Sequence, residues 1–326
     1  MNSWGERFRI TIWGESHGHQ VGVSIDGVPA GIALSEEDFT ADLDRRRSGA
    51  AGTTPRKESD TPRIVSGLYN GFTTGSPLTI EFQNENTRSG DYRNLVVHPR
   101  PSHADLVAQQ KWNGFNDPRG GGHFSGRITL GMVAAGVVAK KILGTEVNFT
   151  TDITEIGGCS DKEQWAELID QAQRSHDSIG GLIECRVGGI PAGLGEPFFD
   201  SVESLAAHLL FSVPAVKGVE FGAGFSSARM RGSEHNDPII SAEGETATNH
   251  AGGIVGGITN GNEIVAKVAI KPTASISLEQ QTFNFESQKI EGLIIHGRHD
   301  VCITLRAAVV VEAAMAIALA DLKLRA

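Results

Sequence analysis

Six short segments of the sequence hold most of the side chains that could do chemistry. The first, GESHGH (14–19), follows a strand-like run and presents Ser16 and His17 in a turn between glycines. It lacks the GxSxG pattern of a hydrolase nucleophile, so His17 is its candidate general acid or base. A turn histidine without a chemical task is the alternative, and the fragment alone favours that alternative.

Two further segments are rich in cations. DRRRSG (44–49) stands at the end of an expected helix, where arginines suit the helix dipole but could equally grip a phosphate or carboxylate. HPRPSHADL (98–106) is a proline-stiffened loop whose His-x-Asp spacing, His103 and Asp105, could orient an imidazole. For both segments a structural role and a binding or catalytic role stay open.

Three loops could bind an anion. DPRGGGHFSGR (117–127) matches neither a Walker loop nor a dinucleotide fingerprint, yet it precedes an apolar helix whose first-turn amides favour anions. KPTASIS (271–277) combines a lysine with three hydroxyls after a strand, which suits a phosphate. GRHD (297–300) precedes the last helix, where Asp300 could line a ligand site or simply cap that helix. A turn without a ligand is the alternative for the first two loops.

Composition restricts the classes of function. A formal net charge of -10 argues against a surface for nucleic acid or an anionic membrane, so any anion site must be local. Three widely spaced cysteines predict neither a disulfide framework nor a metal site, and they fit a reducing cytoplasm. The charged start, MNSWGERFRI, does not resemble a secretory signal. The apolar run 307–320 is shorter than the ~20 residues of a bilayer span and contains Glu312, so it predicts a buried helix.

The elements that must position these loops are strands and helices in mixed order. Short β-branched runs bounded by glycine or proline predict strands within 7–16, 22–31, 76–82, 182–190 and 264–270. Helical spacing predicts helices within 34–47, 126–143, 160–181 and 306–324, of which the second and fourth are apolar on nearly all sides. No linker or repeat divides the chain. We therefore expect one α+β domain, 1–326, with sheets outside buried helices.

Taken together, the segments resemble one family. GESHG, DRRR, RPSHAD, RGGGHFSGR, NHAGGIVGGI, KPTAS and GRHD follow one another between Phe8 and Leu322, and this order closely resembles the chorismate synthase family. The resemblance implies a β-α-β sandwich, with a helical layer between antiparallel sheets, and a homotetramer. It also implies anti 1,4-elimination of phosphate from 5-enolpyruvylshikimate 3-phosphate to give chorismate, the last common step of aromatic amino acid biosynthesis. Reduced FMN is required for that reaction but is not consumed.

The resemblance assigns roles to individual residues. His17 would protonate the departing phosphate, His103 would lie near the flavin, and Asp300 would assist proton removal. Ser16 and Ser125 would relay hydrogen bonds. The substrate's phosphate or carboxylate would be bound by Arg46, with Arg45, Arg47 and Arg127 close by. Contacts with FMN would come from His123, Phe124, Ser125, Ala215, Gly256, Lys271, Pro272, Thr273, Ala274, Ser275 and Arg298.

The sequence departs from many relatives at three places. His123 and Phe124 stand where an arginine and a serine are common, and Pro214 stands where an asparagine is common. An arginine that often follows the RRR run is missing, and Arg56 is the candidate to replace it. The alternatives to a lyase are a flavin reductase that uses NADPH as reductant and a non-catalytic flavin-binding protein.

Overall fold

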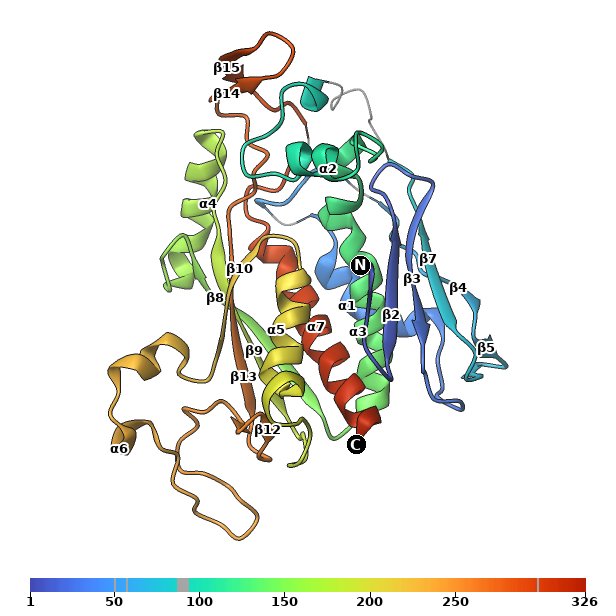
Figure 1. The fold of residues 1–326 in the computed structure, drawn as a ribbon, viewed down its shortest axis with the longest axis vertical. Coiled ribbons are helices and arrows are strands. Elements are labelled where there is room, and N and C mark those ends of the chain that lie inside the picture. The colour runs from blue at the N-terminus through green and yellow to red at the C-terminus, as the bar shows by residue number, and fades with distance from the viewer. Residues whose placement is uncertain (50, 57, 87–93, 298) are drawn as a thin grey trace.

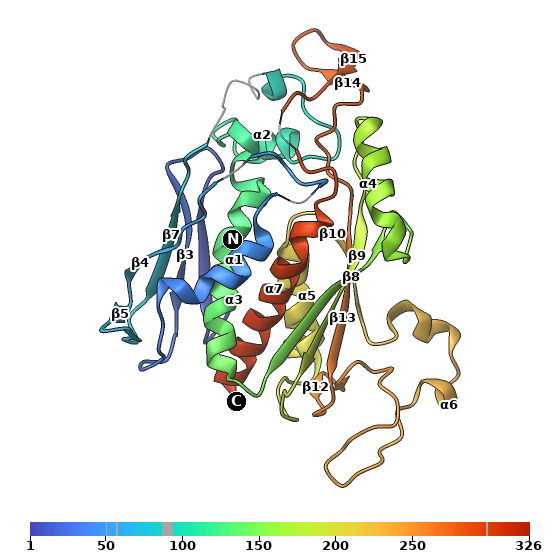
Figure 2. The same ribbon diagram turned by 180° about the vertical axis from the view of Figure 1, so that it is seen from behind.

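Two antiparallel sheets form the outer layers of the molecule, and helices fill the space between them (Figure 1; Figure 2). The computed structural model describes residues 1–49, 51–56, 58–86, 94–297 and 299–326. This arrangement is the β-α-β sandwich that the family resemblance implies, and the expected α+β fold with sheets outside buried helices is confirmed. Within the described ranges, no helix is both long enough and apolar enough to cross a membrane.

The first sheet carries its apolar side chains on the face that meets the helices. In the central strand β3, Val21, Val23 and Ile25 are fully buried at every second position, as expected for a sheet covered on one face. Val21 pairs with Phe82 and Ile25 with Leu78 of the neighbouring strand. The strand order is β1 (Ser3–Trp4), β2 (Arg9–Gly14), β3 (Gln20–Asp26), β7 (Leu78–Gln83) and β4 (Arg63–Ser66).

The second sheet repeats this pattern on the opposite side of the helices. Ile183, Cys185 and Val187 alternate along β9 with no exposed surface, and Ala266 and Val268 of β13 pair with two of them. The strand order is β10 (Val216–Phe221), β13 (Ile264–Ile270), β9 (Gly181–Gly188) and β8 (Asn148–Ile156).

The helical layer is built on two long apolar helices, α3 (Thr129–Leu143) and α7 (Thr304–Arg325). α3 packs against β3 and α7 against β8 and β9, so each sheet has its own helix, and α5 (Val202–Ser212) packs beside α7. Small residues let the two long helices approach closely. A Cβ atom on Gly136 would lie 2.5 Å from the Cβ of Ala313, and therefore only glycine fits at this contact.

Shorter elements surround this core. The hairpin β14–β15 projects at one end of the molecule, and the segment that carries α6 projects at the other (Figure 1). The remaining helices and strands are α1 (Thr40–Arg46), α2 (Asp105–Lys111), α4 (Trp165–Arg174), α6 (Gly232–His235), β5 (Leu68–Tyr69), β6 (Phe72–Thr73), β11 (Ile254–Val255), β12 (Ile258–Thr259), β14 (Gln280–Asn284) and β15 (Lys289–Leu293). Short 3-10 helices span Glu36–Phe39, Arg119–Phe124, Gly126–Ile128, Lys162–Gln164, Phe198–Asp200 and Gly224–Arg229.

Candidate active site

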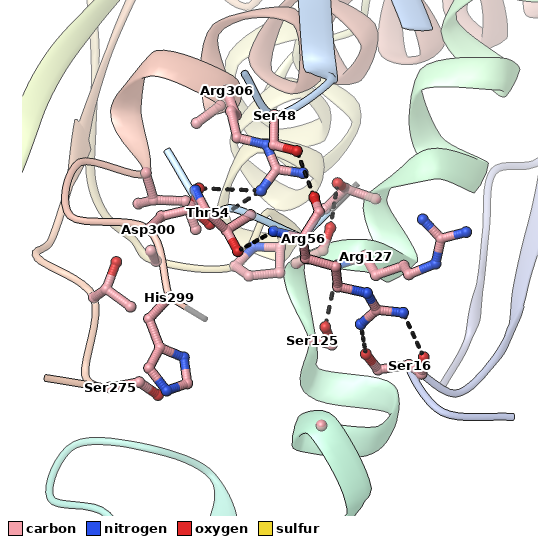
Figure 3. A pocket seen from close by; sticks show the side chains of 18 of the residues that line it. Ser16, Ser48, Thr54, Arg56, Ser125, Arg127, Ser275, His299, Asp300 and Arg306 are labelled. Atoms are coloured by element: carbon pink, nitrogen blue, oxygen red, sulfur yellow. Dashed lines mark hydrogen bonds and ion pairs between the residues drawn. The ribbon is translucent and has the colours of Figure 1, made fainter. Parts of the chain in front are cut away.

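A pocket of about 740 Å³ lies where three helix ends meet, namely the C-terminus of α1 and the N-termini of α3 and α7. The turn after β2 and the loop after β13 also line it, so both sheets contribute (Figure 3). Side chains at helix and strand ends are free of the packing demands of the core, which is why polar groups can gather here.

Most of the residues predicted from the sequence line this pocket. They are Ser16, His17, Arg46, Arg47, His103, Phe124, Ser125, Arg127, Ala215, Lys271, Pro272, Thr273, Ala274, Ser275 and Asp300. Segments more than 200 residues apart in the sequence therefore meet in one cavity. Arg298 lies outside the described residues.

Three predicted residues do not line the pocket. Arg45 is next to Arg46 on α1, where successive side chains point about 100° apart, and its guanidinium binds both oxygens of Glu312 at 2.7 Å. This carboxylate raises the pKa of Arg45 above its usual range. His123 donates its Nδ1 hydrogen to the carbonyl of Gly14 at 2.8 Å. Gly256 lies in the turn between β11 and β12.

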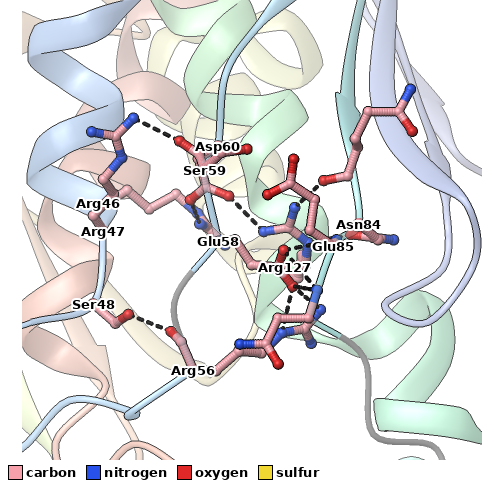
Figure 4. Close-up of polar contacts among 12 residues, drawn as sticks. Arg46, Arg47, Ser48, Arg56, Glu58, Ser59, Asp60, Asn84, Glu85 and Arg127 are labelled. Carbon is pink, nitrogen blue, oxygen red and sulfur yellow. Dashed lines mark hydrogen bonds and ion pairs between the residues drawn. The ribbon is translucent and has the colours of Figure 1, made fainter.

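A buried carboxylate joins two of the pocket arginines (Figure 4). Asp60 accepts a hydrogen bond from Arg127 Nη1 at 2.6 Å and from Arg46 Nη1 at 3.4 Å. Arg46 is only 2 % exposed, and it also donates to Thr129 Oγ1 and to the carbonyl of Gly126. Burial raises the pKa of Asp60, but the two guanidinium charges outweigh that effect and hold it below its usual value. The carboxylate therefore fixes both arginines in place.

Arg46 is cationic at neutral pH in spite of its burial. Desolvation, followed by the charge of Arg306, lowers the pKa of Arg46 to about 9. A guanidinium that has already lost its water shell binds an anion at a smaller desolvation penalty.

Arg56, the candidate to replace the arginine missing after the RRR run, lines the pocket. Its Nη1 donates to Ser16 Oγ at 3.1 Å, and its Nε and Nη2 donate to Glu58 at 2.8 and 2.6 Å. Ser16 is fully buried, so this bond connects the turn after β2 to the loop that follows α1 (Figure 3). Arg56 thus adds a cation to the pocket beside the predicted Ser16 and His17.

The glycine-rich segment closes around His17. His17 is 8 % exposed, and a Cβ atom on Gly120 would lie 2.5 Å from two atoms of its ring. Gly120 has φ 63°, a conformation that glycine adopts without strain. The glycine therefore serves both the turn and the close approach of the imidazole.

Asp300 is held by Arg306, a residue without a local signal in the sequence. Arg306 Nη1 donates to the two carboxylate oxygens at 3.1 and 3.0 Å, and the amide of Thr54 donates to Oδ1 at 2.9 Å (Figure 3). Arg306 Nε also donates to the carbonyl of Arg46 at 2.9 Å. Asp300 is thus oriented by the first turn of α7 and does not cap that helix.

The His-x-Asp spacing brings an imidazole and a carboxylate together. His103 Nδ1 lies 2.7 Å from Asp105 Oδ1, and Arg100 donates to both oxygens of Asp105 at 2.7 Å. Arg100 Nη1 also donates to Ser275 Oγ at 2.8 Å. Burial raises the pKa of Asp105, but hydrogen bonds from Arg100 and His103 outweigh it and hold the pKa far below its usual value.

The loop 271–275 offers groups for an anion. Thr273 Oγ1 is buried and has no hydrogen-bond partner among the described residues, although Thr273 lines the pocket. Lys271 donates to the carbonyl of Ser102, and burial, together with the charge of Lys217, lowers its pKa. An unsatisfied hydroxyl beside a lysine and Ser275 is what a phosphate group would complete.

Asp60 and Arg306 were missed because their segments carry no local signal. Asp60 lies in an irregular loop, and Arg306 begins a mostly apolar run that predicts only a buried helix. Arg100 was noted only as part of a loop. The tertiary contacts that make these residues functional span 67 and 260 positions for Asp60–Arg127 and Arg306–Arg46.

The pocket is strongly basic in an acidic chain. Among the described residues that line it, six arginines and one lysine face three carboxylates and three histidines, whereas the whole chain has a net charge of -10. A concave site that joins guanidinium groups to histidines and a held carboxylate defines an enzyme that acts on an anionic small molecule.

Comparison with known proteins identifies the family. A family model described as chorismate synthase matches residues 8–324. A chorismate synthase from Chitinophaga pinensis is 60 % identical over 324 residues, covering 99 % of this chain and 97 % of the relative. One from Dehalococcoides mccartyi is 46 % identical, covering 100 % and 97 %. A crystal structure of a chorismate synthase superposes with TM-score 0.76 at 28 % identity, covering 99 % of this chain and 93 % of the other. The chain belongs to the chorismate synthase family, whose members are phosphate-eliminating lyases.

Proposed function

We propose that the basic pocket is where this chain eliminates phosphate from 5-enolpyruvylshikimate 3-phosphate to form chorismate, with reduced FMN as cofactor. The observation that carries the proposal is the concentration of six arginines around His17 and Asp300 in a chain of net charge -10. A phosphorylated dicarboxylate needs such a site, because each anionic group requires donors that replace its lost water.

Arg46, Arg127 and Arg56 are the proposed substrate-binding groups. Asp60 and Glu58 hold their guanidinium groups in place before a ligand arrives, so little side-chain entropy is lost on binding. Arg47 is more exposed, with 41 % of its side chain accessible, and is proposed to contact the outer part of the ligand.

His17 and Asp300 are the proposed proton-transfer groups, supplied by opposite sides of the pocket. His17 follows β2 of the first sheet and would protonate the departing phosphate. Protonation makes the phosphate a better leaving group. Asp300 precedes α7 and would accept a proton at a carboxylate oxygen that Arg306 keeps oriented. Ser16 and Ser125 are proposed as hydrogen-bonding neighbours of these groups.

The residues present fit FMN. The unpartnered hydroxyl of Thr273, with Lys271 and Ser275, suits the phosphate of the cofactor, and Phe124 and Ala215 offer apolar contact for its ring. A cavity of about 740 Å³ lies in the upper part of the range of about 300 to 1,000 Å³ that small-molecule sites span, which supports two ligands held together. When bound, reduced FMN supplies electron density while the C–H bond breaks.

The test is phosphate release under anaerobic conditions with dithionite-reduced FMN. We expect release by the wild type and a loss of at least about 100-fold in His17→Ala and in Asp300→Ala, as lost proton-transfer groups require. His19→Ala is the matched control, because His19 is two residues from His17 but exposed. Near-normal rates in both variants would remove these residues from the mechanism. Replacing dithionite by NADPH tests the flavin reductase alternative, and tight FMN binding without turnover would indicate a binding protein.

Three further properties are proposed with the function. One hydrophobic core cluster contains residues of both sheets and of helices α3, α5 and α7, which supports a single domain 1–326. Exposed aromatic side chains at Phe198, Phe199 and Phe225 support burial between copies in a homotetramer, which light scattering would test. Three free cysteines support a location in the reducing cytoplasm.

A further inference from the structure

We propose that Asp105 is a positioning residue that keeps the proton of neutral His103 on Nδ1, so that Nε2 is the ring atom that exchanges protons in the pocket. Arg100 and Ser275 complete the network that holds Asp105. The proposal rests on the proposed function only for the identity of the ligand that exchanges a proton with His103. The position of the proton can be measured in the protein alone.

The contacts of Nδ1 determine whether this nitrogen carries the proton of the neutral ring. Nδ1 lies 2.7 Å from Asp105 Oδ1 and 3.0 Å from Arg100 Nη2. These neighbours make opposite demands, because a carboxylate accepts and a guanidinium only donates. Arg100 Nη2 carries two hydrogens, and it donates one of them to the same oxygen of Asp105 at 2.7 Å. That oxygen and Nδ1 are only 2.7 Å apart, so the second hydrogen, which diverges from the first in the guanidinium plane, points away from Nδ1. Nδ1 is therefore the donor, and Asp105 the acceptor.

Asp105 remains a fixed acceptor because it is both buried and paired. Its side chain is 8 % exposed, and Arg100 binds it through Nε, Nη2 and the backbone amide at 2.7, 2.7 and 3.1 Å. Arg100 stands between Pro99 and Pro101, whose rings limit the backbone angles of the loop. Asp105 itself opens α2, which lets its carboxylate turn back toward the loop.

The other edge of the ring lies against the glycine-rich segment. A Cβ atom built on Gly121 would lie 3.5 Å from His103 Nε2, so this nitrogen faces the segment that continues into Phe124 and Ser125. His103 lines the pocket with these two residues. With the proton on Nδ1, the lone pair of Nε2 is available on this side.

The network also ties the imidazole to the proposed phosphate loop. Arg100 Nη1 donates to Ser275 Oγ at 2.8 Å, so a chain of hydrogen bonds runs from His103 through Asp105 and Arg100 to the loop 271–275. Partners of this kind fix the tautomer and the ring orientation of histidines in other enzymes, and their loss reduces activity without removing the histidine itself.

The first experiment is nitrogen NMR on the full-length protein without ligands, with ¹⁵N-labelled histidine rings, at about pH 8. The His103 signals are assigned by their loss in His103→Gln. We expect a protonated Nδ1 and an unprotonated Nε2. A neutral ring protonated on Nε2, the form that free histidine prefers, would overturn the proposal, whatever the enzyme's activity.

The second experiment removes the charge of the acceptor. Asp105→Asn is expected to move the His103 proton toward Nε2, and Asp105→Glu to restore part of the Nδ1 form. Asp117→Asn is the control, since Asp117 forms a similar pair with Arg119 in a nearby loop. A folded Asp105→Asn variant with an unchanged tautomer would refute the role of Asp105. If that variant does not fold, the wild-type spectrum alone decides.

The activity assay separates this proposal from the proposed function. Asp105→Asn should lower kcat for phosphate release by about 10- to 100-fold with little change in KM, as expected for a residue that acts through another. An unchanged kcat in the folded variant would contradict a positioning role. Failure of the wild type to release phosphate would refute the proposed function, while the NMR result on the tautomer would still stand.

Discussion

Gly120 offers a direct test of how His17 is positioned. In Gly120→Ala, the new Cβ would lie 2.5 Å from Cδ2 and Nε2 of His17, and contacts become ordinary only beyond 3.4 Å. The ring must therefore move by about 1 Å, a displacement that can reduce a reaction rate by about 100-fold. The backbone at φ 63° adds a destabilisation of about 1–2 kcal/mol for a residue with a Cβ atom.

Gly114 provides a matched control six positions earlier in the chain. Gly114→Ala meets the same backbone penalty at φ 79°, but nothing lies within 4 Å of its Cβ. Both variants should lose about 1–2 kcal/mol in the free energy of unfolding. Only Gly120→Ala should also lose about 100-fold in kcat.

Urea unfolding and anaerobic phosphate release would be measured for both variants. The comparison separates strain in the loop from displacement of the imidazole, because only the second differs between the two positions. A Gly120→Ala enzyme with nearly normal kcat, or equal losses of kcat in both variants, would refute the assignment of this glycine to His17.

Three other changes have expected outcomes. Arg46→Ala should raise KM for the phosphorylated substrate by about 100-fold or more, as for a lost charge-assisted contact of about 3 kcal/mol, whereas Arg45→Ala should change KM little because Arg45 binds Glu312. Asp60→Asn should destabilise the fold by about 3–5 kcal/mol at neutral pH, measured by urea unfolding, because it leaves two buried guanidinium groups without their carboxylate. The pKa of Asp60 in the fold lies below its ordinary value near 3.8. The contribution of Asp60 to the free energy of unfolding is therefore complete above pH 3.8 and is lost as the pH falls through the folded value. The Asp60→Asn variant should thus lose less stability on acidification than the wild type. Ala215→Gly should raise the free energy of unfolding by about 1 kcal/mol, because Ala215 has φ 76° in the structure; a lower value would contradict strain at this position.

The sequence predicts the elements whose pattern is local. The apolar stretches around 129–143 and 304–325 are helices and are buried between the sheets, as their composition requires. The His-x-Asp spacing leaves the pairing of His103 with Asp105 open, and the structure brings His103 Nδ1 to 2.7 Å from Asp105 Oδ1. Such features depend on neighbours in the chain.

Features that depend on tertiary contacts could not be predicted in the same way. Arg45 and Arg46 are identical in type and adjacent, yet one binds Glu312 of α7 and the other enters the pocket. Only the rotation of α1 relative to α3 and α7 decides between them. Asp60 likewise gains its role from Arg46 and Arg127, which reach it from two different helices.

The pairing of the pocket cations with carboxylates explains how the basic pocket is stable without a bound anion. Asp60, Glu58, Asp105 and Asp300 each bind a guanidinium group of the pocket or its wall. Each pair reduces the repulsion among the cations, and yet it leaves other N–H groups of the guanidinium available, since arginine carries five donors. A bound phosphate therefore adds to the carboxylate contacts and need not displace them. For this reason, replacing a carboxylate should reduce the stability of the fold more than it reduces the affinity of the pocket for the anion.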